Sequence, residues 1–266
     1  KAALSAGKVI QQYMNNDVLV ENKKGGTSRA SQVVTIVDKE CETAILSHLL
    51  PTCDEFDLAL LRALDDNDPD RLESSLDQLL QSRLIETVAD APNKYRFKHA
   101  LLQDAAYSSL LRNRRSDLHG KLAAILEGNT VGVSEQALEL HARHWARAGH
   151  SERAVARYRE AAKAALSRCA AAEANALITD ATVLLPKIAD PTLRKRYEAE
   201  LQLLKVQVIT LTQSVSAPDV GPALERAQTL AAQTGDHQLL SSALNERWGR
   251  RLFTGDPRGA KKCAGK

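Results

Sequence analysis

Short turns divide the second half of the chain into segments of about 15 to 20 residues with a helical pattern, a common length for helices in packed arrays. Beyond Gly132, the breaks fall near Gly149, Cys169, Asp190 with Pro191, Ser216 to Gly221, and Gly235. Helices joined by short turns pack as antiparallel neighbours. The pattern therefore predicts antiparallel helix pairs over this half, and a chain that is mostly α-helical.

One spacing of small and bulky residues recurs within these segments. Its fullest form is an alanine, a bulky residue, a second alanine and a proline, at Ala174, Ile178, Ala181 and Pro186. The shorter form occurs at Ala154, Tyr158 and Ala161 and, less closely, at Ala223, Ala227 and Leu230. Small residues let paired helices approach, and the bulky residue fills the neighbouring groove. The full pattern resembles the second helix of the tetratricopeptide unit, which repeats about every 34 residues.

The hydrophobic period changes within the stretch from Tyr95 to Leu111. Tyr95 and Phe97 alternate with charged residues, as in a strand with one apolar face. From Ala100 onward, apolar residues recur at the spacing of a buried helix. This stretch is therefore predicted to join a strand-bearing unit to a helical one.

Upstream of this joint, the sequence predicts two helices and a hairpin. FDLALLRALDD, from Phe56, has the pattern of a short helix, and Asp68 with Pro69 supplies the N-cap and first-turn proline of a second helix, DRLESSLDQLLQSRL. IETV and YRF then flank the turn-forming ADAPNK. This order is typical of a winged-helix unit, to which the Tyr95–Leu111 stretch would add the second wing strand and the exit helix.

The first fifty residues are predicted to form a small α+β segment. A helical pattern over 1–14 is followed by a strand at 18–21, a polar loop, an extended piece at 32–38 and a helix at 39–50 that Pro51 stops. The two apolar strands would need partners to form a sheet.

Composition and charge exclude several classes of protein. Hydrophobic residues make up 44% and aromatic residues only 4%, so a core built mainly from Leu, Ala, Val and Ile is expected. The net charge of +3 gives no general field for nucleic acid or an anionic membrane. The sequence has no apolar run of about 20 residues and no signal pattern, so we expect a cytoplasmic protein. The four cysteines lack zinc or redox spacing, and no cofactor is expected.

Three stretches within the first sixty or so residues share features with a phosphatase family: AALSAGKVIQQYM, VENKKGG and ASQVVTIVDKECETAILSHLLPTCDEFDLALL. They resemble the start of the inositol monophosphatase-like superfamily, particularly its 3'(2'),5'-bisphosphate nucleotidase branch. The element VVTIVDKECE is similar to that family's T-x-x-D and implies that Asp38 lies near a Mg²⁺ cluster. Such chemistry needs several converging carboxylates. The family's paired Glu, D-P-x-D-G-T loop and W-D motif have no counterpart here, so we expect a fragment too short to hold an active site.

Two further phrases carry a second resemblance, which extends from about Asp57 to Ala260. These are YRFKHALLQDAAYSSLLRNRRSDLHGKLAAILE and ALELHARHWARAGHSERAVARYREAAKAAL. They resemble the region after the ATPase core in AAA-type signal-transduction ATPases with numerous domains, often joined in bacteria to class III adenylate cyclases or Ser/Thr kinases. The resemblance implies a regulatory helical module. The phosphate-binding G-x-x-x-x-G-K-[ST] motif does not occur, and KKGGTS at Lys23–Ser28 lacks its spacing.

The candidate partner-binding or interdomain residues are His99, Arg112, Arg114, Arg115, Trp145 and Tyr158. His99 lies at the strand-to-helix junction, where a cap or a link between layers is favoured over acid–base catalysis because no carboxylate or nucleophile is fixed beside it. Trp145 follows the pair His141 and His144, and it favours packing between helices over a metal site.

Arg112, Arg114 and Arg115, with Lys121, form a basic cluster. A basic cluster beside a winged helix raises the possibility of DNA binding. The helix that would enter the groove, Pro69 to Arg83, carries three acidic and two basic residues. Phosphates would repel this excess of acidic charge. A solvated face, or contact with a nucleotide-binding core, is favoured over nucleic acid.

The predicted organisation has four parts: a phosphatase-like fragment at 1–56, a winged-helix-like unit at 57–131, a tetratricopeptide-like array at 132–253 and a flexible tail at 254–266. The predicted function is that of a non-catalytic regulatory module of a bacterial signalling ATPase, which binds a protein partner or a sister nucleotide-binding domain. One alternative is a Mg²⁺-dependent phosphomonoesterase, a bisphosphate nucleotidase or inositol phosphatase, with Asp38 as a metal ligand. The other is a winged-helix DNA-binding regulator.

Overall fold

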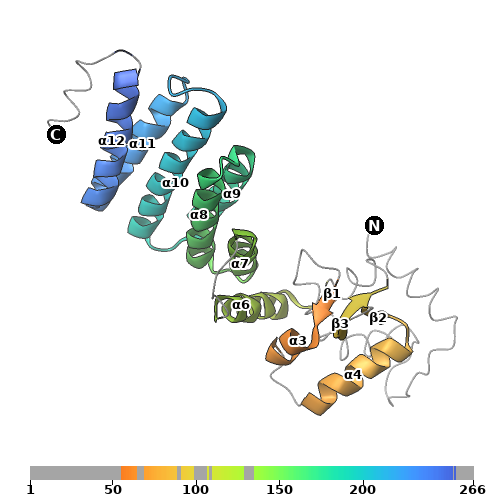
Figure 1. Cartoon of the computed structure of the whole chain (residues 1–266). Coiled ribbons are helices and arrows are strands. Elements are labelled where there is room, and N and C mark those ends of the chain that lie inside the picture. Colours follow the sequence, from red (N-terminus) through yellow and green to blue (C-terminus); the bar gives the residue numbers. More distant parts are fainter. Residues whose placement is uncertain are drawn as a thin grey trace, which may run out of the picture. The chain divides into compact units, whose positions relative to one another are not determined.

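The computed structural model describes residues 55–64, 69–88, 91–98, 107, 110–128, 135–253 and 255. The chain divides into two compact units, residues 1–125 and 126–266, and each is described by itself (Figure 1). The elements predicted within the first 54 residues lie outside the described residues, as do Asp38 and His99.

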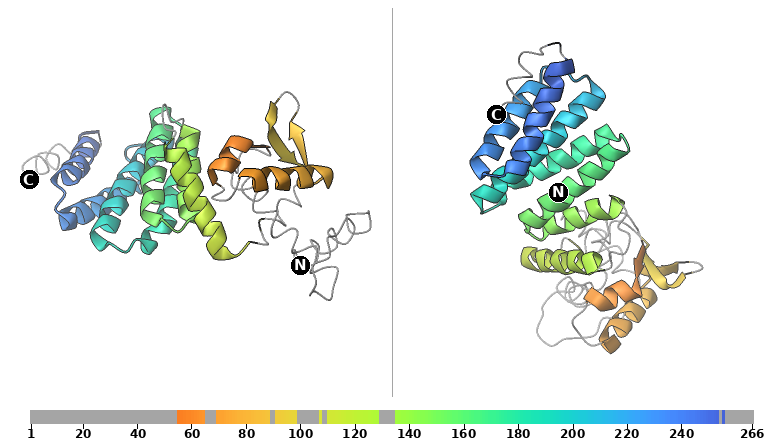
Figure 2. Two further views of the ribbon diagram at one scale, coloured as in Figure 1. Left: turned by 90° about the horizontal axis from the view of Figure 1, so that it is seen from below. Right: turned by 60° about the vertical axis from the view of Figure 1, so that its left-hand side comes forward.

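The described residues of the first unit begin with a small antiparallel sheet and two short helices. Its elements are β1 (Glu55–Asp57), α3 (Leu58–Leu64), α4 (Pro69–Gln81), β2 (Ile85–Val88) and β3 (Ala91–Phe97). The strand order is β1-β3-β2, and the β2–β3 hairpin projects away from α3 and α4 (Figure 2). Within the hairpin, Glu86 lies opposite Arg96, and the two side chains form an ion pair with a nitrogen–oxygen distance of 2.6 Å. The two helices and the hairpin predicted from the sequence are therefore present.

Strand β1 corrects the prediction that a helix begins at Phe56. Residues 55–57 pair with 94–96 of β3, and α3 begins only at Leu58. The pairing gives partners to backbone groups along one edge of β3. Since that edge is formed by residues some forty positions later, local helix propensity could not indicate it.

The residues of α4 explain why this segment is helical and where the helix ends. Pro69 occupies the first helical position, where its missing N–H costs nothing, and Leu72, Leu76 and Leu79 form a buried stripe. The helix ends in a Schellman motif: the Leu84 N–H donates to the Leu79 carbonyl and the Arg83 N–H to the Leu80 carbonyl. The helix predicted to extend to Leu84 therefore ends three residues earlier.

Helix α6 (Arg112–Gly128) follows the joint, whereas the exit helix predicted within residues 100–111 lies largely outside the described residues. Its buried residues are Leu118, His119, Leu122 and Ala123, which lie on one face. The unit boundary falls within this helix, so that Glu127 belongs to the second unit.

The second unit is a stack of helices. Its elements are α7 (Glu135–Arg147), α8 (Ser151–Ser167), α9 (Ala171–Leu184), the 3-10 turn η1 (Leu185–Lys187), α10 (Pro191–Thr212), α11 (Val220–Thr234) and α12 (His237–Phe253). Successive helices pack against each other, and α10 also contacts α8 and α12, so alternate helices share a layer (Figures 1 and 2). The fold of the described chain is thus mostly α-helical and tetratricopeptide-like, as predicted.

The recurring small and bulky positions lie at the helix–helix contacts. All nine helical positions of the pattern are buried: Ala154, Tyr158, Ala161, Ala174, Ile178, Ala181, Ala223, Ala227 and Leu230. Pro186 lies in η1, directly after α9. The spacing identified in the sequence therefore does mark packing surfaces, including its least regular copy in α11.

Two of the turns between these helices have the same hydrogen bonds. After α7 the His150 N–H donates to the Trp145 carbonyl, and after α8 the Ala170 N–H donates to the Ala165 carbonyl. Both are Schellman motifs that place one residue in the left-handed conformation. That residue is Gly149, with φ of 82°, in the first turn and Cys169, with φ of 62°, in the second. Only the first turn has the residue that this conformation favours.

We predict that Cys169→Gly stabilises the chain by about 0.5–1 kcal/mol. A left-handed conformation costs a residue with a Cβ roughly 1–2 kcal/mol, and the greater freedom of glycine in the unfolded chain offsets part of that gain. The free energy of unfolding, measured in urea, checks this. Cys169→Ala should leave it nearly unchanged and Cys169→Val should lower it, and a Cys169→Gly variant no more stable than Cys169→Ala would contradict the assignment.

Candidate functional site

The three predicted arginines lie together in the first turn of α6. Arg112 is exposed, whereas Arg114 and Arg115 are half-buried. The Arg115 guanidinium lies 5.2 Å from the centre of the Tyr107 ring, and the Tyr107 hydroxyl is 3.0 Å from Nε2 of the buried His119. No acidic residue occupies the first turn of α6, so the arginines meet the positive end of the helix dipole. The cluster is therefore partly committed to packing within the first unit.

Trp145 and Tyr158 lie in the second unit and are both buried. Tyr158 is in α8, and burial, with the charge of Asp180, raises the pKa of its hydroxyl to about 12. It is therefore neutral and serves packing. Partner binding or interdomain contact was predicted for both residues, but in this arrangement they contribute to the helical core, as favoured for Trp145.

Trp145 is the centre of a polar group that we call the Trp145 cluster: Glu127, Trp145, His150, Arg153 and Arg157. The Trp145 indole N–H and the Arg157 Nε–H both donate to Oε1 of Glu127, at 2.8 and 3.1 Å. Arg153 lies 4.5 Å from the centre of the Trp145 ring. One carboxylate thus gives a buried indole its hydrogen-bond partner and joins the end of α6 to α7 and α8.

The pKa values of Glu127, within the Trp145 cluster, and of the nearby His141 are both lowered. Burial alone would raise the pKa of Glu127, but hydrogen bonds from Trp145 and Arg157 and the charges of Arg157 and Arg153 outweigh it and lower that pKa. His141 of α7 is only 3% exposed. Burial and the charge of Arg157 lower the pKa of His141, and the opposite effect of Glu127 does not restore it. The buried imidazole is therefore held in its neutral form.

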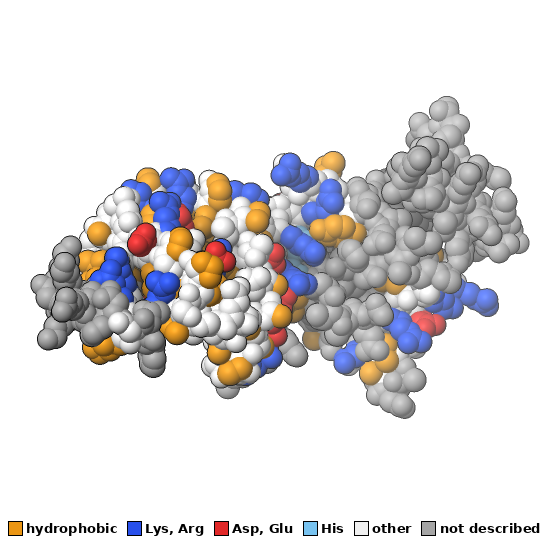
Figure 3. Space-filling view, turned by 90° about the horizontal axis from the view of Figure 1, so that it is seen from above, with side chains coloured by type: hydrophobic (Ala, Val, Ile, Leu, Met, Phe, Trp, Pro, Cys, Tyr) orange, Lys and Arg blue, Asp and Glu red, His pale blue; other side chains and the backbone are white. Residues whose placement is uncertain are grey.

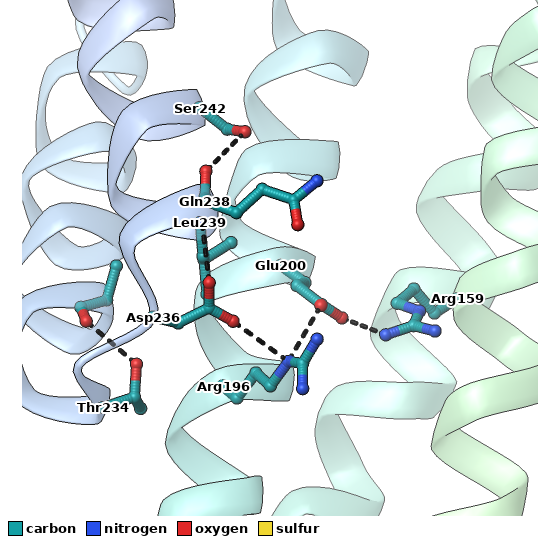
Figure 4. Close-up of polar contacts among 9 residues, drawn as sticks. Arg159, Arg196, Glu200, Thr234, Asp236, Gln238, Leu239 and Ser242 are labelled. Carbon is teal, nitrogen blue, oxygen red and sulfur yellow. Dashed lines mark hydrogen bonds and ion pairs between the residues drawn. The ribbon is translucent and has the colours of Figure 1, made fainter.

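A second polar group joins α8, α10 and the start of α12 (Figure 4). Arg159 of α8 forms an ion pair with Glu200 of α10, and Arg196 lies 3.5 Å from Glu200 and 3.4 Å from Asp236. Oδ1 of Asp236 accepts a hydrogen bond from the Leu239 N–H at 3.0 Å and so caps α12. We call Arg159, Arg196, Glu200 and Asp236 the inter-repeat network. It spans three alternate helices of one layer.

Sequence reasoning did not identify the inter-repeat network. Arg196 and Glu200 are four residues apart on a helix, which was a visible signal for an ion pair. Arg159 and Asp236 come from other helices, and only the packing of α8 and α12 beside α10 brings them close. Further contacts of this kind join α11 to its neighbours, such as Arg226 with Glu198 at 2.7 Å and Arg247 with Gln228 at 2.6 Å.

Large hydrophobic side chains are also exposed on the second unit. They are Val183, Leu211, Trp248 and Leu252. Basic side chains are more prominent than acidic ones on the face drawn in Figure 3, with hydrophobic groups between them. Apolar and basic groups side by side are a common composition of protein-binding surfaces.

Neither metal ligation nor membrane insertion is indicated within the described residues. No group of three or more His, Cys, Asp or Glu side chains that could hold a metal ion occurs in this part of the chain. The helices seen in the structure include none with the length and apolar character required to cross a bilayer.

Comparisons with known proteins give two matches. No family model matches the chain. An uncharacterized protein of Rhizobium meliloti is 28% identical over 178 residues, which are 65% of this chain and 16% of that protein. The crystal structure of a signal transduction ATPase with numerous domains and a tetratricopeptide repeat sensor, from Pyrococcus horikoshii, matches with a TM-score of 0.46 at 14% identity. That match covers 98% of this chain and 43% of the other. The chain thus spans less than half of either protein.

We predict that acid destabilises the second unit through His141. Its ordinary pKa of 6.5 is lowered in the folded chain, so the unfolded chain binds the proton more readily. Stability from the neutral imidazole is present above the unfolded pKa and is lost as the pH falls through 6.5 toward the folded pKa. Glu127 adds a loss only at lower pH, below its ordinary value of 4.5.

Urea unfolding between about pH 7 and pH 5 measures this effect. His141→Gln should flatten the pH dependence in that window, and the same change at the exposed His237 serves as the matched control. Equal slopes for the wild type and His141→Gln would show that His141 is not the group that titrates.

We predict that Glu200 of α10 is coupled more strongly to Arg159 of α8 than to Arg196 of its own helix. The side chains of Arg159 and Glu200 are 19% and 16% exposed, whereas Arg196 is 52% exposed. Shielded pairs are screened less by solvent, so a double-mutant cycle with Arg159→Gln and Glu200→Gln should give a coupling above about 1 kcal/mol. The matched cycle with Arg196→Gln should give less than about 0.5 kcal/mol. Similar couplings in the two cycles would refute the ranking.

Proposed function

We propose that this chain is a non-catalytic regulatory module of a bacterial signalling ATPase of the adenylate cyclase-associated type. The tetratricopeptide-like array of the second unit binds a protein partner or a sister nucleotide-binding domain, in the cytoplasm. The activity of the larger protein that such a module would serve is part of this proposal.

The proposal is carried by the burial of the repeated small and bulky positions between helices. Alanine and bulky residues at equivalent places in α8, α9 and α11 are buried between helices, so the array is assembled from stacked units. Stacked units leave long helix faces in solvent, and here those faces carry Leu211, Trp248 and arginines. Apolar groups supply affinity and charges supply orientation in protein recognition.

The first unit is assigned in the same proposal to the winged-helix type. Its order of strand, two helices and hairpin supports that assignment, as does the antiparallel order β1-β3-β2. In this role the unit contacts the nucleotide-binding core of the signalling ATPase and not DNA, because the charges of α4 oppose the approach of phosphates.

Site-specific photocrosslinking tests the proposal. Benzoyl-phenylalanine placed at Val183, Leu211 or Trp248 in cells should capture a discrete partner, since all three side chains are exposed. The partner, purified separately, should then bind the purified chain with a defined stoichiometry in calorimetry. Capture without such binding does not support the proposal.

A phosphate-release assay tests the alternative that the chain is a Mg²⁺-dependent phosphomonoesterase. Phosphate released from a 3'(2'),5'-bisphosphate nucleotide or an inositol phosphate in the presence of Mg²⁺ would indicate an enzyme, provided that Asp38→Asn abolishes it. Catalysis of that kind, together with the absence of a reconstituted partner, would refute the interaction module. A salt-dependent DNA shift would favour the regulator instead.

A further inference from the structure

An apolar row runs along α12 from the core into solvent. Leu240, Leu244, Trp248 and Leu252 are spaced four apart, and we call them the α12 row. Leu240 packs against the buried cluster of Ala199, Leu230, Ala231 and Leu239. Farther along, Trp248 is 43% exposed and Leu252 is 44% exposed. The row therefore begins as part of the array and ends as a surface.

Along the same direction, one face of α10 changes from charged to apolar side chains. Arg196, Glu200, Gln207 and Leu211 lie on one face of α10 by helical spacing. The ion pair of Arg196 with Asp236 joins the first half of α10 to the start of α12. The hydrogen bond from Arg250 Nε to the Val215 carbonyl, at 3.2 Å, joins the end of α12 to the loop after α10. The two helices are therefore parallel, with charged groups at one end and Leu211, Trp248 and Leu252 toward the other.

Positive charge accompanies the row along α12. Between Leu244 and Leu252 the helix carries Arg247, Arg250 and Arg251 against Glu246, a net charge of +2. A ligand that covers the exposed row therefore meets a basic surface, which attracts acidic groups and repels basic ones.

We propose that the α12 row is a docking surface for an acidic amphipathic helix of a protein partner. The inference rests on the proposed function and names the chemistry of its partner. Apolar side chains of the partner helix, spaced three and four apart, pack between Leu244, Trp248 and Leu252. Its flanking Asp and Glu residues face the arginines at the end of α12. The spacing of the row matches a helical ligand, because ridges four residues apart fit the grooves of another helix.

Trp248 is expected to supply much of the binding free energy. A half-exposed indole still has a large apolar area to bury, and tryptophan is prominent among residues that dominate interfaces. The arginines add association rate and selectivity for acidic sequences, and these effects weaken as salt is added.

Fluorescence anisotropy with designed peptides on the full chain tests the proposal. The probe is a fluorescein-labelled amphipathic helix of about 18 residues with a leucine row flanked by glutamates, long enough to be helical when bound. A second peptide has lysines in place of the glutamates, and a third has the first composition scrambled. The acidic helix should bind at least about tenfold more tightly than either of the others.

Matched variants locate the binding. Trp248→Ser and Leu252→Ser should each weaken the acidic peptide by about tenfold or more, and Val183→Ser, at an exposed apolar residue of α9, should leave it unchanged. Circular dichroism checks that the variants remain folded. Equal affinity for Trp248→Ser and the wild type would overturn the proposal, as would tight binding of the lysine peptide.

Two other occupants would also overturn it. One is a second copy of the chain, shown by a dimer in sedimentation that Trp248→Ser abolishes. The other is a lipid surface, shown by binding to vesicles containing phosphatidylglycerol that the same substitution abolishes while peptide binding persists. If photocrosslinks form at Val183 and none at Trp248 or Leu211, the docking surface is wrong while the interaction module stands. If no position yields a partner that binds when purified, the module itself fails.

Discussion

Close contact between helices at alanine positions is the constraint on which the second unit depends. Alanines in every helix from α7 to α12 are fully buried, among them Ala142, Ala154, Ala174, Ala199, Ala227 and Ala243. A methyl side chain lets two backbones approach, so a larger residue there would force the helices apart, and the displacement would pass to the next pair. Few aromatic residues are needed in such a core, which accounts for the 4% aromatic content. The composition and the stacked arrangement thus have one physical origin.

Contacts between small residues do not by themselves fix how far one helix is shifted along its neighbour, so other interactions must do so. Sliding one alanine-rich face along another changes buried area little, whereas ion pairs and hydrogen bonds depend on position. The inter-repeat network fixes α8, α10 and the start of α12 at one level, and Arg226 with Glu198 does the same for α10 and α11. Hydrophobic contact therefore stabilises the stack, while charged groups on its surface specify how the helices align.

The parts of this fold that were predictable depend on local signals. Helix ends at Gly149 and Gly235 and the cap at Asp190 with Pro191 act through the backbone of neighbouring residues, and the repeated alanines follow helical spacing. The unpredicted parts join distant residues: β1 pairs with β3, and Arg159 reaches Glu200 only because α8 packs beside α10. The same distinction holds for Trp145. Its neighbours along the chain indicated a packing role, but the carboxylate that accepts its N–H comes from the preceding helix.

The two tryptophans of the array differ in their exposure to solvent. Trp145 is 2% exposed, and its indole N–H is satisfied by Glu127 in a group that includes three helices. Trp248, by contrast, lies 43% exposed on α12, in an apolar row that begins in the core at Leu240. An array gains nothing in stability by leaving an indole and two leucines half in water. The proposed docking of an acidic helix would bury these groups, and the arginines of α12 would then select the acidic ligand.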